Sequence, residues 1–263
     1  MFSPERICLN TFKKAVDIMQ QAYRALRVVS EAQTIRIVLD ANPGELMLTE
    51  LCTACAGLNT SASNGVKAVV LDFKNTPGRE EKPASSASLD RACAAVRAVG
   101  QPVLAVIRAS LVPTLVYAAD LTLAAHDAVL MLPDNDTITG TQAARIGYIT
   151  WSVSASDLDR EMERILDMLR SKSAIALRLT KASVRVGMGE LNNAGALSEA
   201  CCRGAPRRYP FNSFAPPPRT AAERLEAFQQ VNTLYLNQVM QTADAHEGLK
   251  AFLEKRKPQW KNQ

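Results

Sequence analysis

Long hydrophobic runs are absent from this sequence. A membrane-spanning helix needs about 20 predominantly apolar residues, and no such run occurs among the 263 residues. The first residues, MFSPERICLNTFKK, also lack the basic stretch followed by an apolar stretch that is typical of a secretory signal. We therefore expect a cytoplasmic protein without a membrane span.

A basic block with interleaved aromatic residues is also missing. Aromatic residues make up 5% of the chain, and the net charge is only +5. Since nucleic-acid-binding proteins gather lysine and arginine on one face, we expect no nucleic-acid partner. A mild positive balance instead suits an anionic ligand. The length and the 47% hydrophobic content are typical of one large globular domain, or of one domain with a helical extension.

Motifs for metals and nucleotides are scarce. No P-loop, dinucleotide fingerprint or Ser/His/Asp spacing is visible. The six cysteines suggest no disulfide framework, and only Cys52 and Cys55 have metal-ligand spacing. Because this pair lies in an apolar helical segment and no second pair completes four ligands, we interpret both as buried core thiols. We predict no metal site and no separate cofactor.

The two histidines have modest interpretations. His126 lies beside Asp127 in a predicted turn between strands, where a solvated turn residue is favoured over a catalytic one. His246 lies in the segment 244–247, DAHE, where capping of a helix explains the polar residues.

Strands and helices alternate through the first part of the chain. The pattern predicts strands at 34–39, 66–73, 102–108, 121–125, 128–132 and 148–153, and helices at 11–30, 46–58, 89–99, 112–119 and 142–146. From about residue 157 the pattern is helical, apart from the proline-rich stretch 203–219. This order predicts an α/β fold with a mostly parallel sheet. We divide the chain into a helical extension (1–33), an α/β core (34–153) and a helical C-terminal region (154–263) with an irregular insertion near 192–224.

The final segment carries a specific resemblance. Its ending, LYLNQVMQTADAHEGLKAFLEKRKP, resembles the C-terminus of the crotonase (enoyl-CoA hydratase/isomerase) superfamily. The segments TIRIVLDANPGELMLTEL, VKAVVLDF, PVLAVIRASLVPTLVYAADLTLAAHDAVLMLP and ITGTQAARIGYITWSV resemble successive parts of the same family. ALRLTKASVRVGM together with the C-terminus looks most like the cyclic dienoyl-CoA hydratases. The resemblance implies a crotonase-like ββα spiral with a helical C-terminal region, packed as a homo-oligomer (trimer or hexamer).

The resemblance also implies a ligand. Crotonases bind acyl-CoA thioesters, so coenzyme A would arrive as part of the substrate. The family's adenine- and phosphate-contacting residues correspond to Phe252 and Lys255. An aromatic ring beside a cation can hold a stacked base next to a phosphate. The alternative is structural: Phe252 as a core anchor of the last helix, and residues 255–257 as basic residues at its C-terminus.

The sequence departs from the family where the oxyanion hole should be. One backbone donor of the family lies in a loop with an Ala-Gly-Ala-Asp-type motif. The corresponding loop here, 74–88, is short and lacks this motif, and residues 84–87 are the segment most similar to it. The other lies in a Gly-Gly pair, which is replaced here by Leu111, Val112, Pro113 and Thr114. Pro113 has no N–H group, and Leu111 and Val112 put side chains where the thioester would lie.

The two carboxylates of a hydratase are also altered. The correspondence places Thr114 at the first position and Asp134 at the second. Asp134 can act as a base in place of the family's glutamate, although a segment that usually follows it is missing and a turn role is the alternative. Thr114 is the expected first residue of a helix, by its capping preference.

The resemblance and the departures from it lead to two hypotheses about function, from different classes. The first is an enoyl-CoA hydratase/isomerase-type lyase, acting on a cyclic dienoyl-CoA in its most specific form. The second is a non-catalytic homologue with a degenerate active site, serving as a structural or acyl-CoA-binding subunit. A third interpretation is an imperfect gene model that lacks segments of the site.

Overall fold

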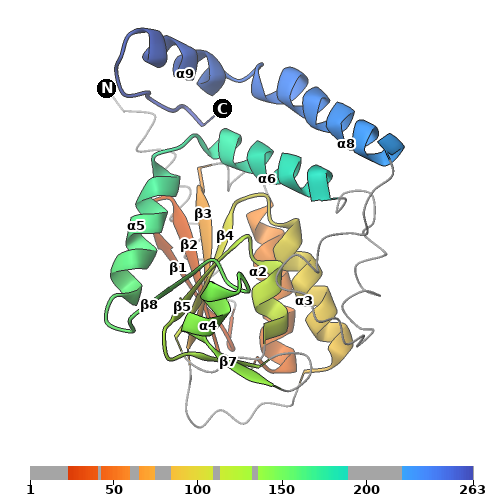
Figure 1. Ribbon diagram of the computed structural model, residues 1–263, viewed down its shortest axis with the longest axis vertical. Coiled ribbons are helices and arrows are strands. Elements are labelled where there is room, and N and C mark those ends of the chain that lie inside the picture. Colours follow the sequence, from red (N-terminus) through yellow and green to blue (C-terminus); the bar gives the residue numbers. More distant parts are fainter. Residues whose placement is uncertain are drawn as a thin grey trace. The chain divides into compact units, whose positions relative to one another are not determined.

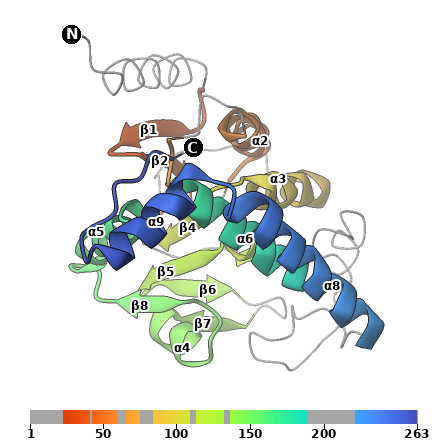
Figure 2. The same cartoon turned by 90° about the horizontal axis from the view of Figure 1, so that it is seen from above.

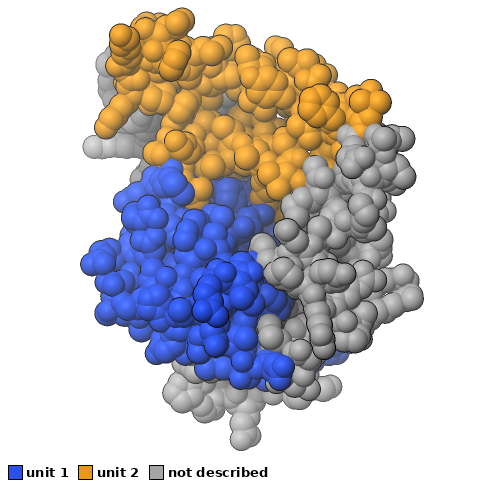
Figure 3. All heavy atoms as spheres, viewed as in Figure 1, with its two compact units in different colours: residues 1–168 blue, residues 169–263 orange. Residues whose placement is uncertain are grey.

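The chain folds into two compact units, residues 1–168 and residues 169–263 (Figure 3). The computed structural model describes residues 23–40, 43–59, 65–74, 84–108, 113–131, 136–188 and 221–262. No helix within these ranges is long and apolar enough to cross a membrane.

The first unit is built on a six-stranded sheet with the order β1-β2-β3-β4-β5-β8 (Figure 1). Strands β2 to β8 of this sheet run parallel, and β1 pairs antiparallel with β2. The bounds are β1 Arg27–Glu31, β2 Thr34–Asp40, β3 Ala68–Lys74, β4 Val103–Ile107, β5 Leu121–Ala125 and β8 Trp151–Val153. In β3 every residue before Lys74 is buried, as a central parallel strand requires. The predicted α/β class is confirmed.

Helices lie on both faces of this sheet (Figure 1). One face packs against α2 (Glu45–Leu58) and α3 (Ser86–Ala98). The buried side chains of this layer include Ile37, Leu71, Phe73, Ala105 and, from the helices, Leu51 and Val96. The opposite face is covered by α5 (Leu158–Arg170), which buries Leu158, Met162, Ile165 and Leu166. Both faces of the central strands are thus removed from water.

Strand β1 corrects the expected helix over 11–30, and with it the end of the predicted helical extension. Residues 27–31 pair with β2 from Arg27 opposite Val38 to Glu31 opposite Thr34. The two turn residues Ala32 and Gln33 both have positive φ, 41° and 65°, which is the twist that a two-residue hairpin needs. Tertiary pairing with β2 therefore overrides a helical spacing of apolar residues. Residues before 23 lie outside the described part.

A small hairpin and helix lie at the β8 end of the sheet (Figure 2). Strand β6 (Val129–Met131) pairs with β7 (Thr137–Thr139) in a separate two-stranded sheet, and α4 (Gly140–Arg145) follows. Thr139 and Gln142 form a capping box that starts α4. Gly140 is required here, because a Cβ atom at this position would lie 2.0 Å from the carbonyl oxygen of Ala125.

The second unit is helical. It contains α6 (Ala174–Met188), α8 (Ala221–Leu234), a π-helical turn η4 (Tyr235–Val239) and α9 (Ala243–Leu253). Asp244 of α9 is buried and accepts hydrogen bonds from Ser173 Oγ (2.5 Å) and from the N–H groups of Lys261 (2.7 Å) and Asn262 (3.0 Å). Residues 189–220, most of the predicted insertion, lie outside the described part.

Candidate functional site

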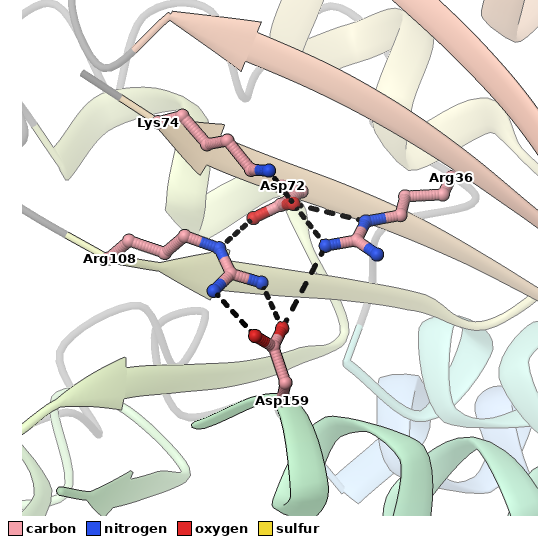
Figure 4. A network of polar contacts seen from close by, with 5 residues as sticks. All are labelled: Arg36, Asp72, Lys74, Arg108 and Asp159. Atoms are coloured by element: carbon pink, nitrogen blue, oxygen red, sulfur yellow. Dashed lines mark hydrogen bonds and ion pairs between the residues drawn. The ribbon is translucent and has the colours of Figure 1, made fainter. Parts of the chain in front are cut away.

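Five charged side chains gather on the α5-covered face of the sheet (Figure 4). They are Arg36 of β2, Asp72 and Lys74 of β3, Arg108 directly after β4, and Asp159 in the first turn of α5. The carboxyl ends of β3 and β4 meet here. Open α/β sheets bind ligands outside the carboxyl ends of their strands, so this edge is the candidate site of the first unit. We call these residues the Asp72 cluster.

Asp72 is the inner member of the cluster. Its side chain is fully buried, at 0% exposure. Its Oδ2 accepts from Nε of Arg36 (3.0 Å) and from Nη2 of Arg36 (2.5 Å), and its Oδ1 accepts from Nε of Arg108 (2.7 Å). The ammonium group of Lys74 lies 3.7 Å from Oδ2. A buried carboxylate is costly unless cations and hydrogen bonds compensate it, and these three partners do so.

Asp159 is the outer member. Its side chain is 68% exposed, yet both of its oxygens accept from the guanidinium of Arg108, with Nη1 at 3.3 Å from Oδ2. The hydrogen bond from Arg108 is the main cause that lowers the pKa of the Asp159 carboxyl. Burial acts to lower the pKa of Arg108, but its hydrogen bonds to Asp159 and Asp72 outweigh burial and raise it. The outer pair therefore stays charged.

The cluster is suited to holding charge rather than to moving a proton. It contains three cations and two carboxylates, and Arg36 and Arg108 are only 21% and 22% exposed. A general acid or base needs a pKa near the working pH. The shift of Asp159 goes in the opposite direction, since its pKa falls below its ordinary value. What the arrangement offers is a set of oriented positive charges at the edge of a sheet.

Solved structures show which fold this is. No protein-family profile matches the chain, and no curated protein matches its sequence. An enoyl-CoA hydratase from Mycobacterium smegmatis superposes with a TM-score of 0.67 at 18% identity, covering 90% of this chain and 99% of that one. An enoyl-CoA hydratase/isomerase from Mycobacterium paratuberculosis gives 0.66 at 18% identity, covering 92% and 100%. An enoyl-CoA hydratase from Bacillus anthracis gives 0.66 at 17% identity, covering 91% and 100%.

The chain has the crotonase fold. The fold agrees with the expected order of strands and helices. At these identities the likeness concerns the architecture, and the residues of the site have to be considered one by one.

The structure describes only part of the residues predicted to be catalytic. Thr114 is the second residue of η2 (Pro113–Ala118), a 3₁₀ helix where a short helix over 112–119 is predicted. The side chain of Thr114, and Asp134, Leu111 and Val112 altogether, lie outside the described residues. Their predicted roles stay predictions.

The segment 84–87, the nearest material to the first oxyanion donor, starts α3. Ser85 is its N-cap, and its Oγ accepts from the N–H of Ser88 at 3.2 Å. The N–H of Ser85 donates to Glu45 Oε2 at 3.1 Å, and the Ser88 hydroxyl donates to the other oxygen of Glu45. The amide of Ser85 is therefore engaged by α2. The N–H groups of Ser86 and Ala87, in the first helical turn, have no acceptor within the helix.

The predicted CoA contacts of this crotonase fold lie in the second unit. Phe252, in α9, is 80% exposed, which is not the environment of a core anchor. Lys255 is exposed and has φ 52°. Two backbone hydrogen bonds close α9 at this residue. The N–H of Lys255 donates to the carbonyl oxygen of Phe252 (3.2 Å), and the N–H of Arg256 donates to the carbonyl oxygen of Ala251 (3.0 Å). This is the Schellman arrangement, in which glycine usually takes the position of Lys255.

The two histidines form local hydrogen bonds, and two of the described cysteines lie in α2. His126 lies in the turn after β5 and shares a 2.6 Å hydrogen bond with Ser152 Oγ. His246 Nδ1 donates to the carbonyl oxygen of Thr242 at 3.0 Å, and Thr242 caps α9. Cys55 is buried in α2, and burial raises the pKa of the half-buried Cys52 thiol. No three metal-binding side chains come together within the described ranges.

The Asp72 cluster was not predicted, although the sequence carries a signal for it. Asp72 interrupts the apolar strand sequence AVVLDF, which is buried on both faces. A buried carboxylate needs partners, and the neighbouring strands offer Arg36 in TIRIVLD and Arg108 after VLAVI. Only the pairing of β2, β3 and β4, which the sequence does not state, brings these residues together.

Proposed function

We propose that this chain binds acyl-CoA thioesters and acts as an enoyl-CoA hydratase/isomerase. The observation that supports it most is the crotonase fold combined with the AFLEKR segment at the end of α9. In that segment Phe252 is exposed and Lys255 occupies a position where glycine would be less strained. Backbone strain that persists at one residue suggests a use for its side chain, and a cation there fits a CoA phosphate.

The proposed reaction is the addition of water to an enoyl-CoA. A base takes a proton from water as its oxygen attacks the β-carbon. The thioester oxygen collects negative charge that backbone N–H groups stabilise, and the protonated base then gives its proton to the α-carbon. In this proposal Asp134 is the base and the hydroxyl of Thr114 holds the water. The first turn of α3 and the residues that follow Pro113 in η2 provide the N–H donors. A cyclic dienoyl-CoA is the proposed substrate, and a trimer or hexamer is the proposed assembly.

The second candidate is a non-catalytic acyl-CoA-binding subunit. Two observations favour it: the Ser85 N–H donates to Glu45, and Pro113 at the start of η2 has no N–H. Both places where the family keeps its donors are thereby altered. In this candidate the chain still binds CoA through Phe252 and Lys255 but does not catalyse hydration.

One titration separates the two. The purified protein is titrated calorimetrically with crotonyl-CoA and with a cyclic dienoyl-CoA, and hydration is followed by absorbance in the same samples. Turnover that Asp134→Asn abolishes, and that Asp136→Asn two residues further along preserves, supports the enzyme. Binding of equal strength in all three proteins without turnover supports the subunit. No binding of either thioester contradicts both.

A further inference from the structure

The Asp72 cluster has an inner half that fixes its arginines and an outer half that faces solvent. The inner carboxylate binds the Nε edges of Arg36 and Arg108 from within the sheet. Arg108 consequently presents its Nη1 and Nη2 fork on the other side, where Asp159 accepts from both (Figure 4). A guanidinium oriented in advance loses little rotamer freedom on binding an anion.

We propose that Arg36, Lys74 and Arg108 form a binding site for a phosphate group, and that the carboxylate of Asp159 stands in for this phosphate. Asp159 is the one acid of the cluster that can leave. Its side chain is largely exposed and belongs to the first turn of a helix, whereas Asp72 is fully buried in a strand. Because the Asp159 carboxylate is 68% exposed, water competes for it, and a stronger anion can displace it by a change of its side-chain rotamer.

The charge balance favours phosphate over a carboxylate. With Asp159 turned away, three cations and the carboxylate of Asp72 leave a net charge of +2. A phosphate monoester carries roughly −1.5 to −2 at neutral pH, and so matches this charge where a single carboxylate would not. Arg36 already approaches the position, with its Nη2 3.9 Å from Asp159 Oδ1.

The place in the fold agrees with a ligand role. Arg108 follows β4, and Lys74 is the last residue of β3. Both therefore lie at the carboxyl end of the parallel sheet, where α/β proteins receive ligands. The phosphate can come from coenzyme A, in which case the inference rests on the proposed function, or from inorganic phosphate, in which case it does not.

The experiment uses three probes at constant ionic strength: CoA, pantetheine (which has no phosphate) and inorganic phosphate. Each is titrated calorimetrically into the wild type, Asp159→Asn and Arg108→Gln. Matched controls on the same helix are Glu161→Gln and Arg164→Gln, which break an exposed ion pair outside the cluster. Thermal unfolding of every variant shows that it is folded.

We expect Asp159→Asn to tighten CoA or phosphate binding about two- to fivefold, since the substitution removes a competing carboxylate that is largely exposed to solvent. Arg108→Gln should weaken it about tenfold or more, the effect of losing a bidentate charge-assisted contact. The two controls should leave both affinities unchanged, and pantetheine should not respond to any variant.

The outcomes distinguish this inference from the proposed function. Phosphate binding that follows the variants, without binding of CoA or crotonyl-CoA, supports the inference and contradicts the proposed function. CoA binding of equal strength in the wild type, Asp159→Asn and Arg108→Gln overturns the inference and leaves the proposed function standing. Absence of CoA and phosphate binding in both the wild type and Asp159→Asn overturns the inference too.

Discussion

Replacing Lys255 with glycine is expected to stabilise the second unit while weakening its interaction with CoA. Lys255 has φ 52°, in the left-handed region. A side chain in this region costs about 1 kcal/mol or slightly more. The two hydrogen bonds that close α9 here are made by backbone atoms, so the glycine variant keeps them.

The size of the effect follows from two opposing contributions. Glycine removes the cost of about 1 kcal/mol but gives the unfolded chain more freedom, which costs about 0.5 kcal/mol. The net gain is about 0.5 kcal/mol, or a rise of about 2 °C in Tm. Lys255→Ala is the matched control, because alanine keeps the strain and removes the same charge. Lys257→Ala removes a charge from the same basic run without touching the strained position.

Thermal unfolding and CoA titration of the three variants check the prediction. Lys255→Gly should be more stable than Lys255→Ala, and both should bind CoA several-fold more weakly than Lys257→Ala. Equal stabilities of the glycine and alanine variants would refute the backbone reasoning. Wild-type affinity in both would refute a ligand role for the ammonium group.

Three further predictions concern stability. Asp72→Asn should cost about 3 kcal/mol in urea unfolding, since it leaves two largely buried guanidiniums without their inner carboxylate; a loss below 1 kcal/mol contradicts this. Gly140→Ala should cost about 2 kcal/mol because its Cβ meets a carbonyl oxygen, whereas Gly65→Ala, with nothing within 4 Å, should be neutral. Hydrogen bonds from Arg256 are the main cause that holds the pKa of Glu247 at about 2. This depressed pKa adds stability above pH 4.5 that is lost as pH falls towards 2. The Tm difference between wild type and Glu247→Gln should therefore shrink over that range, and a constant difference would contradict the assignment.

Local sequence patterns predicted the central strands well. The strand 121–125 was predicted with the bounds that the structure has, and the helix 46–58 begins one residue earlier, at Glu45. Both are apolar segments next to turn residues, His126-Asp127 and Pro43-Gly44, so local preference and tertiary packing agree. β1 was missed because its turn is Ala32-Gln33 instead of a recognisable Asn-Gly or Asp-Gly pair. Strand pairing, rather than local preference, decides that segment.

The candidate site was less predictable than the fold. Phe252 and Lys255 could be proposed from one contiguous segment, AFLEKR, because their spacing is local. The Asp72 cluster could not, since its members come from three strands and a helix and only the parallel register of β2, β3 and β4 brings them together. Arg36 also reaches diagonally: the residue opposite Asp72 in β2 is Val38. A contact between residues that are not opposite one another in the sheet cannot be predicted from the pattern of each strand alone.

The buried Asp244 joins Ser173 to Lys261 and Asn262. This connection has a consequence for the order in which the chain can fold during synthesis. The N–H of Ala174, at the start of α6, donates to the side chain of Asn262 at 3.0 Å, across 88 residues. Trp260 Nε1 likewise donates to the carbonyl oxygen of Ser171 at 2.7 Å. The start of α6 therefore gains these partners only after residues 260–262 have left the ribosome. A ribosome that stalls before Trp260 therefore leaves the beginning of α6 without these partners.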